Sequence, residues 1–221
     1  MYRLKKRIDE LMIKAVLFDL DGTLINTNNL IIKSFNHTFK KHLNKTLDEK
    51  EIVMFFGEPL KETLARYDRE NVDALLKTYM EYNEVRHDEL TKSFEGVEDA
   101  IKAIKERDIK VGVVTSKRRV MALKGLQLFG LDRLMDVIIT PEDTKLHKPY
   151  GEPVLKACEV LKINPEEAIM VGDSYYDILC GKNAGAKACL VKYTALPIEE
   201  ILKYDPDYTI DSIRELVEFI A

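Results

Sequence analysis

Two aspartates one residue apart, Asp19 and Asp21, directly follow a short apolar run and have the spacing to act together. The run covers residues 15–18 and predicts a buried strand, because it is bulky, uncharged and soon followed by Gly22. Side chains alternate along a strand, so the two carboxylates point to the same side. They repel each other unless a metal ion lies between them or one carries a proton. The pair therefore predicts metal-binding or acid–base chemistry at a strand end.

Two ordinary structures also place an aspartate before a glycine. A hairpin turn is disfavoured because the residues that follow have helical periodicity instead of the alternation of a second strand. An EF-hand calcium loop is excluded because its glycine and glutamate positions hold Leu24 and Leu30. The aspartate pair alone does not decide between structure and catalysis, so the elements around it matter.

Further strands and helices alternate along the second half of the chain. The predicted strands cover residues 111–115, 136–140, 168–172, 188–191 and 208–210. Helical patterns separate most of them, at about 97–107, 118–129, 151–162, 175–184 and 198–203. Strands that alternate with helices favour an α/β fold with a doubly wound parallel sheet, in which helices cover both faces.

The stretch from about residue 28 to residue 90 interrupts this alternation, because its apolar residues recur only at helical spacing. Within it, Thr46 and Glu49 have the spacing of a capping box at a helix start. The sequence therefore predicts a helical cap domain inserted after the first strand. The insert begins soon after Asp21, so we expect it to lie over the aspartate pair as a lid. The predicted domains are a core at 1–26 and 92–221 and a cap at 27–91.

Ligands of open α/β sheets bind outside the carboxyl ends of the strands. The strand at 111–115 ends in Thr115 and Ser116, and the strand at 168–172 leads into Asp173. Asp177 follows four residues after Asp173, and Lys148 lies between the strands at 136–140 and 168–172. We expect these hydroxyl, carboxylate and ammonium groups to meet Asp19 at one edge of the sheet.

Each of these residues also has a purely structural interpretation. Thr115 and Ser116 can cap the helix that starts near residue 118, and Ser174 with Asp177 has the spacing of a capping box. Lys148 can be an ordinary exposed loop lysine. The appearance of all of them at successive strand ends favours a shared site.

The combined side chains indicate phosphoryl transfer. Asp19 and Asp173 offer the hard oxygen ligands that Mg²⁺ prefers, and Thr115 and Lys148 can hold phosphate oxygens. A carboxylate that attacks a phosphoryl group meets charge repulsion, which a metal ion and a lysine offset. The pattern therefore predicts an aspartyl-phosphate mechanism. The sequence has no Walker loop and no Gly-x-Ser-x-Gly elbow, which disfavours P-loop and serine-hydrolase chemistry.

The composition sets outer limits on the function. The chain has 221 residues, of which 46% are hydrophobic and 33% charged, enough for one large domain or one domain with a smaller insert. The net charge of −4 gives no general attraction for nucleic acid or an anionic membrane. No apolar run approaches the roughly 18 residues that span a bilayer. Three scattered cysteines form no disulfide or zinc pattern, so we expect a reducing, cytoplasmic location.

The first dozen residues contain Lys5-Lys6-Arg7, and no apolar signal-peptide stretch follows. We expect a short amphipathic helix or a frayed end there and assign it no function. We also expect a monomer, with a weak dimer as the alternative.

Together, the motifs closely resemble the four signatures of the haloacid dehalogenase (HAD) superfamily of phosphatases, in the family's order. They are Asp19-Leu20-Asp21-Gly22-Thr23, Thr115-Ser116, Lys148-Pro149 and Gly172-Asp173-Ser174-Tyr175-Tyr176-Asp177. The third departs from the common Lys-Pro-x-Pro, since Gly151 stands at its last position. The insert resembles the cap that one large subclass carries between its first and second motifs.

The resemblance implies a role for each matching residue. Asp19 would be the nucleophile and Asp21 the general acid and base. The phosphoryl group would be bound by Thr115, Ser116 and Lys148. Magnesium would be bound by Asp19, the main-chain oxygen of Asp21 and Asp173, with Asp177 in support.

Strings at 24–28, 34–38 and 87–90 resemble the bacterial HAD-type inorganic pyrophosphatases, which are similar to phosphoglycolate phosphatases. This implies a small phosphorylated substrate, either pyrophosphate or a phosphomonoester such as phosphoglycolate. A sugar phosphomutase of the β-phosphoglucomutase type is the alternative, and a non-catalytic protein is disfavoured because both aspartates are present. A pyrophosphate site needs cations, for which the candidates are Lys61, Arg66, Arg86 and His87 in the cap and Lys117 and Arg118 in the core.

Overall fold

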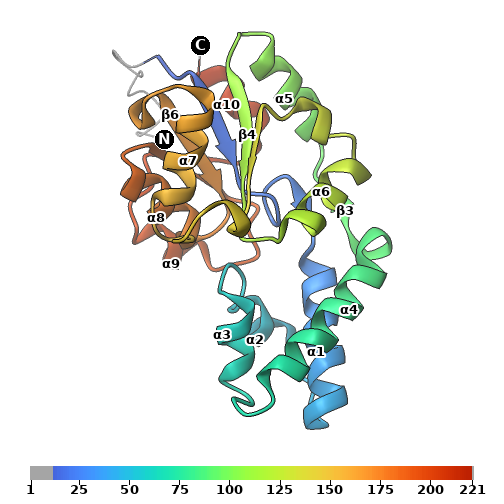
Figure 1. The fold of residues 1–221 in the computed structure, drawn as a ribbon. Coiled ribbons are helices and arrows are strands. Elements are labelled where there is room, and N and C mark those ends of the chain that lie inside the picture. Colours follow the sequence, from blue (N-terminus) through green and yellow to red (C-terminus); the bar gives the residue numbers. More distant parts are fainter. Residues whose placement is uncertain (1–11, 221) are drawn as a thin grey trace.

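The computed structural model describes residues 12–220, and its centre is a six-stranded sheet (Figure 1). The strand order is β5-β4-β1-β6-β7-β8, and all paired strands in this sheet are parallel. The strands are β1 (Ala15–Phe18), β4 (Lys110–Val114), β5 (Val137–Ile139), β6 (Ala168–Gly172), β7 (Lys187–Val191) and β8 (Tyr208–Ile210). The predicted parallel α/β sheet is confirmed, with β1 between β4 and β6. The element expected over the first dozen residues lies, apart from Met12, outside the described residues.

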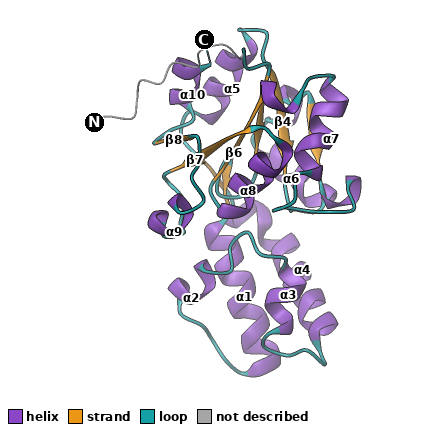
Figure 2. Cartoon of the chain, turned by 90° about the vertical axis from the view of Figure 1, so that its left-hand side faces the viewer, coloured by secondary structure: helices purple, strands orange, loops and turns teal. Residues whose placement is uncertain are grey.

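Helices cover both faces of the sheet (Figure 2). Successive residues of each strand point to opposite faces, so both faces carry apolar side chains that need to be buried. In β1, Val16 and Phe18 belong to one apolar cluster, whereas Ala15 and Leu17 belong to the other. The first cluster includes residues of α5 (Val97–Lys105), α6 (Arg119–Leu128) and α10 (Arg214–Phe219). The second includes residues of α7 (Glu152–Leu161) and α8 (Tyr175–Ala184). Short elements complete this part: α9 (Ile198–Leu202) and the 3₁₀ turns Asp132–Leu134, Pro141–Asp143 and Pro165–Glu167.

Four further helices form a separate group at the carboxyl ends of the strands (Figures 1 and 2). They are α1 (Asn28–Leu43), α2 (Glu49–Val53), α3 (Leu60–Ala65) and α4 (Val72–Leu90). Their apolar faces pack on one another, with the Phe35 and Tyr79 rings 4.9 Å apart. The predicted capping box of Thr46 and Glu49 is wrong. Because α2 begins at Glu49, Asp48 is its N-cap, and the Asp48 carboxylate accepts the Lys50 N–H at 2.8 Å.

A short antiparallel ribbon connects this helical insert to the sheet. It pairs β2 (Ile25–Asn26) with β3 (Lys92–Ser93). The ribbon was not predicted, because two-residue strands leave no readable alternation. The domain boundaries expected at 27 and 91 lie next to it, and the division into domains stays a prediction. None of the helices in the described part of the chain is long and apolar enough to cross a membrane.

Candidate active site

The loop after β1 brings Asp19 and Asp21 to the carboxyl end of the sheet. Asp19 extends the strand ladder by donating its backbone N–H to the Val171 carbonyl at 2.8 Å. At Gly22 the backbone has a φ of +84°, and a Cβ there would lie 2.3 Å from Asp173 Oδ2. Only glycine satisfies both conditions, so this residue lets the first motif pack directly against Asp173.

Three carboxylates and one ammonium group form a buried cluster at this edge. Oxygens of Asp19, Asp173 and Asp177 all lie within 4.8 Å of one another, and all three residues are buried. Lys148 Nζ donates to Asp19 Oδ1 at 2.7 Å and to Asp177 Oδ1 at 2.6 Å. The interpretation of Lys148 as an exposed loop residue is therefore wrong, since it is 7% exposed. Three carboxylates against one ammonium leave a formal excess of two negative charges.

The electrostatics of the cluster reflect that excess. Burial raises the pKa of Asp19 to about 7, the Lys148 ammonium opposes this, and the Asp177 charge adds to it. The pKa of Asp173 is raised well above its ordinary value by burial and by the charges of Asp177 and Asp19. Burial disfavours the charged form of Lys148, but the two carboxylates it contacts outweigh burial and raise its pKa. A divalent cation bound to these oxygens would remove the repulsion.

Asp177 is fixed by the start of α8. The Ser174 backbone N–H and hydroxyl donate to Asp177 Oδ2 at 3.1 and 2.6 Å, which confirms the predicted capping box. Gly172 permits this packing, because a Cβ there would lie 2.2 Å from the Asp177 Cβ. The same carboxylate therefore caps a helix with one oxygen and holds Lys148 with the other.

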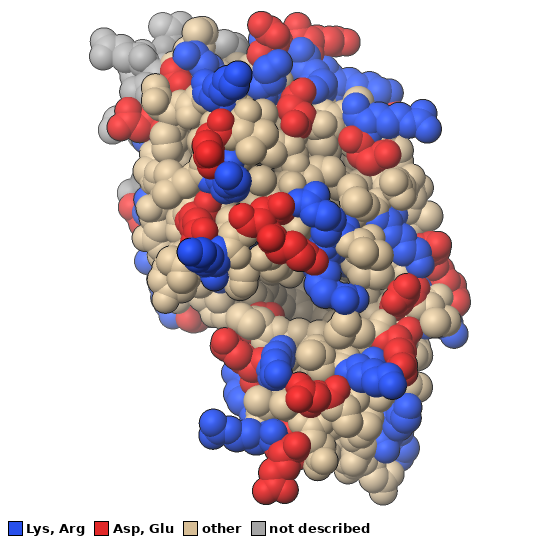
Figure 3. All heavy atoms as spheres, in the orientation of Figure 1, with Lys and Arg blue, Asp and Glu red and all other residues tan. Residues whose placement is uncertain are grey.

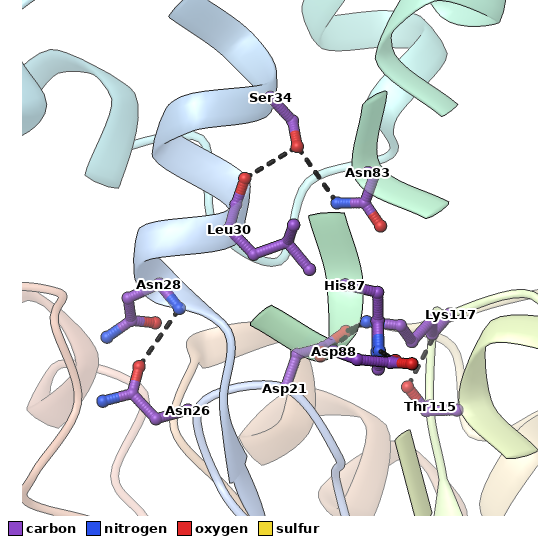
Figure 4. Close-up of polar contacts among 10 residues, drawn as sticks. All are labelled: Asp21, Asn26, Asn28, Leu30, Ser34, Asn83, His87, Asp88, Thr115 and Lys117. Atoms are coloured by element: carbon purple, nitrogen blue, oxygen red, sulfur yellow. Dashed lines mark hydrogen bonds and ion pairs between the residues drawn. The ribbon is translucent and has the colours of Figure 1, made fainter. Parts of the chain in front are cut away.

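A second ion pair lies beside the cluster. Lys117 Nζ donates to Asp21 Oδ1 at 2.8 Å and to Oδ2 at 3.0 Å (Figure 4). The Lys117 backbone N–H donates to Thr115 Oγ1 at 3.1 Å, so the two motifs are tied together. The interpretation of Thr115 and Ser116 as helix caps is wrong, since the Arg119 N–H at the start of α6 donates to the Glu142 carboxylate at 3.1 Å.

A cavity of about 370 Å³ opens between the sheet edge and the helical insert, where the molecular surface is hollowed (Figure 3). Every residue that the four motifs assign to catalysis, phosphoryl binding or metal binding lines this cavity. They are Asp19, Asp21, Thr115, Ser116, Lys148, Asp173 and Asp177. The structure thus brings all of them together around one space.

The opposite wall of the cavity comes from the insert and is largely apolar. Its lining side chains include Ile31, Phe35, Phe55, Phe56, Leu60, Leu76, Tyr79 and Met80. The polar side chains that the insert adds are Asn28, Glu58 and Asn83. No lysine or arginine among the described residues of the insert lines the cavity, whereas Lys117 and Arg118 line it from the core.

The cation candidates expected in the insert are therefore wrong. Lys61, Arg66, Arg86 and His87 do not line the cavity. They pair with acidic neighbours instead: Lys61 with Asp73 at 2.8 Å, Arg66 with Glu58, Arg86 with Glu89 at 2.5 Å, and His87 with Asp88 at 2.9 Å. Sequence reasoning missed the apolar wall because aromatic residues at helical spacing predict core packing equally well.

Comparisons with known proteins find similar sequences and similar folds. The family model described as haloacid dehalogenase-like hydrolase matches residues 16–191. A provisionally named pyrophosphatase PpaX of Clostridium perfringens is 53% identical over 209 residues, which cover 95% of this chain and 98% of that protein. Pyrophosphatase PpaX of Halalkalibacterium halodurans is 43% identical and covers 95% and 97%. The fold matches a haloacid dehalogenase-like hydrolase from Streptococcus pneumoniae at a TM-score of 0.87 and 23% identity, covering 95% and 99%.

Proposed function

The chain belongs to the haloacid dehalogenase-like hydrolase family, and on this premise we propose that it is a Mg²⁺-dependent enzyme that hydrolyses inorganic pyrophosphate through an aspartyl-phosphate. Its relatives show that the chain is a phosphatase of this family. The pyrophosphate substrate, the requirement for Mg²⁺ and the aspartyl-phosphate intermediate are what we propose. The observation that carries it is the buried cluster lining the cavity, in which Asp19 contacts Lys148 and lies close to Asp173. This is an arrangement of nucleophile, cation and metal ligands for phosphoryl transfer.

The proposed reaction assigns one step to each motif. Asp19 attacks the phosphorus atom, and the bridging P–O bond breaks as Asp21 gives its proton to the leaving oxygen. Water then attacks the phosphorus of the aspartyl-phosphate, and Asp21 takes its proton. Thr115, Ser116 and Lys148 hold the transferred phosphoryl oxygens in both steps.

The residues present fit a magnesium ion. The three buried carboxylates offer hard oxygens and carry an excess of two negative charges over Lys148. Asp19, the main-chain oxygen of Asp21 and Asp173 would hold the ion, with Asp177 in support. When bound, it supplies neutralisation of the phosphoryl charge that would otherwise repel the Asp19 carboxylate.

Two observations support pyrophosphate as the substrate. Relatives 43% and 40% identical to this chain carry the name pyrophosphatase. Lys117 and Arg118 line the cavity from the core, and they can meet the charge of a second phosphoryl group. The phosphomutase alternative is disfavoured, because the largely apolar insert wall offers few groups that could bind the hydroxyls of a hexose.

Phosphate release from pyrophosphate and from phosphoglycolate by the purified protein with Mg²⁺ tests the assignment. We expect kcat/KM for pyrophosphate to be higher by at least about tenfold, which corresponds to roughly 1.4 kcal/mol in the transition state. Asp19→Asn controls for contaminating phosphatases. Equal or reversed values would refute the pyrophosphate assignment, and no release from any phosphate compound would refute the phosphohydrolase itself.

We further propose that the insert at 27–91 acts as a cap that closes over the cavity, with the β2–β3 ribbon as its connection. A cytoplasmic location and a monomeric state stay predictions. The three cysteines are free and buried, which fits a reducing compartment.

A further inference from the structure

The three buried carboxylates of the active site are not held in the same way. Lys148 Nζ donates a hydrogen bond to Asp19 and another to Asp177. Among the described residues, the only hydrogen bond to the Asp173 side chain comes from Thr194, whose hydroxyl donates to Oδ2 at 3.3 Å. The third carboxylate is therefore held by a residue that lies outside all four motifs.

The order of the strands explains how Thr194 reaches Asp173. Strand β7 runs parallel to β6 with Leu190 paired to Gly172, so the chain that leaves β7 passes the carboxyl end of β6. Strand β1 lies on the other side of β6, and its loop approaches Asp173 so closely that a Cβ at Gly22 would lie 2.3 Å from Oδ2. Asp173 thus lies between the loops of two neighbouring strands.

The Thr194 hydroxyl has a defined direction. Its oxygen accepts the Leu196 backbone N–H at 3.0 Å, so its single proton remains available for the Asp173 carboxylate. A hydroxyl that accepts one bond and donates another holds its partner at a set angle. Hydrogen bonds of this kind orient carboxylates that bind metal ions.

The preceding residue ties the same loop to the first motif. The Tyr193 hydroxyl donates to the Thr23 carbonyl at 2.8 Å, and the Tyr193 ring lies 4.6 Å from the Phe94 ring. Because Thr23 directly follows Gly22, this bond also fixes the backbone that packs against Asp173. Tyr193 and the residue after it lie beyond the stretch that the family model matches, which ends at residue 191.

We propose that Thr194 is a positioning residue for the magnesium site, which orients the Asp173 carboxylate toward the cation while Tyr193 anchors the loop that carries it. The inference rests on the proposed binding of Mg²⁺. Loss of a group that orients a metal ligand typically weakens metal affinity by roughly 10- to 100-fold. The bond of 3.3 Å is longer than the roughly 2.5–3.0 Å that is usual between two oxygens, so we expect the lower end of that range.

Isothermal titration of the full-length protein with MgCl₂, in the absence of substrate, tests the proposal. Thr194→Val keeps the shape of the side chain but removes the hydroxyl, and it should raise the Kd for Mg²⁺ by about tenfold. Thr194→Ser restores the hydroxyl and should keep the Kd within about twofold of the wild-type value. A Kd that is unchanged in Thr194→Val, or raised equally in both variants, overturns the inference.

Thr38→Val is the matched control. It also removes a buried hydroxyl, which donates to the Ser34 carbonyl at 2.8 Å within α1, and it lies outside the cavity lining. It should leave the Kd for Mg²⁺ unchanged, and an increase equal to that of Thr194→Val would refute a specific role for Thr194. If Thr194→Val does not fold, Tyr193→Phe decides, because it frees the anchored loop and should also raise the Kd. An unchanged Kd in Tyr193→Phe would then refute the proposal.

Turnover of pyrophosphate separates orientation of the metal ligand from a general structural role. At saturating Mg²⁺ the kcat of Thr194→Val should return to within about threefold of the wild-type value, because excess cation compensates for weaker binding. A kcat that stays low at every Mg²⁺ concentration would indicate damage to the fold and overturn the inference. If the wild-type protein binds Mg²⁺ and Thr194→Val binds it equally well, the inference fails and the proposed function stands. If the wild-type protein binds no Mg²⁺, both fail.

Discussion

The two walls of the cavity differ in how their side chains are held. At the sheet edge, charged groups from three separate segments are buried against one another, and Lys148 contacts carboxylates 129 and 29 residues away. On the insert side, the lining is mostly apolar, and lysines and arginines outside the lining pair with nearby acidic residues, as Lys61 does with Asp73 and Arg86 with Glu89. Buried charges at the sheet edge therefore pair across segments that are distant in the sequence, whereas exposed charges of the insert pair with other residues of the insert.

This difference separates two tasks within one site. The sheet edge has its charges fixed by the fold before a substrate arrives, which favours catalysis because the groups need little reorganisation. The insert wall makes weak, undirected contacts, which suit selection by size and polarity. Variants at the sheet edge should therefore change rate or stability strongly, and charge changes in the insert should change little.

The largest effect should come from Asp19→Asn, which removes the proposed nucleophile but keeps the shape of the side chain. We expect kcat to fall by at least about 10⁴-fold, since loss of a nucleophile removes the covalent route. Asp205→Asn is the matched control, because Asp205 is exposed and its φ of 50° suits asparagine equally. Substantial turnover by Asp19→Asn would show that the sheet edge does not supply the nucleophile.

Comparison of two lysines tests whether a buried ion pair contributes more to the free energy of unfolding than a partly exposed one. Lys148→Met should lower the free energy of unfolding by about 3–5 kcal/mol, because it leaves buried carboxylates without their partner. Lys117→Met should cost about 1 kcal/mol, since the Lys117 and Asp21 side chains keep some contact with water. Urea denaturation at pH 8 in metal-free buffer measures both, and equal losses would contradict the role of burial.

The raised pKa of Asp19 predicts a dependence of stability on pH that metal reverses. Between its ordinary value of 3.8 and its folded value of about 7, the folded protein keeps a proton that the unfolded chain releases. Asp19 therefore contributes stability that is present below about pH 4 and is lost as the pH rises through about 7. Magnesium binds the ionised carboxylates, so the increase in Tm that it causes should be larger at pH 8 than at pH 5.5.

Thermal unfolding with and without MgCl₂ at both pH values measures this effect. Asp173→Asn removes one expected ligand and should reduce the Mg²⁺-dependent increase in Tm at pH 8. A shift in Tm that is the same at both pH values, or unchanged by Asp173→Asn, would show that the buried cluster is not the metal site.

The sheet edge was predictable because its residues sit at strand ends. Strand periodicity located Asp19, Thr115 and Asp173 at the carboxyl ends, and the parallel order then brought them together. The capping box of Ser174 and Asp177 was equally readable, since it depends on local spacing alone. The pairing of Lys117 with Asp21 was not predicted. It joins the loops after β1 and β4, and the distance between these loops depends on backbone turns that strand periodicity does not specify.

The insert wall was less predictable for a physical reason. Helical periodicity shows that Phe35 and Leu76 are turned inward, but it does not distinguish a packed interior from the lining of a cavity. The candidates Lys61 and Arg66 failed because long charged side chains on a helix surface pair with any acidic neighbour within reach. Sequence patterns therefore located the chemistry better than the substrate contacts.

The smallest effect is expected from an exposed lysine of the insert, which is compared with a lysine that lines the cavity from the core. Lys61 is 61% exposed in its side chain and pairs with Asp73 away from the cavity, so Lys61→Gln should change kcat/KM for pyrophosphate by less than about twofold. Lys117→Gln is the contrasting variant, since its ammonium group lines the cavity, and it should lower the same constant by about tenfold or more. Steady-state phosphate release at low salt measures both. A larger loss from Lys61→Gln than from Lys117→Gln would mean that the insert moves its charges into the cavity during turnover and that the two walls share the task of binding anions.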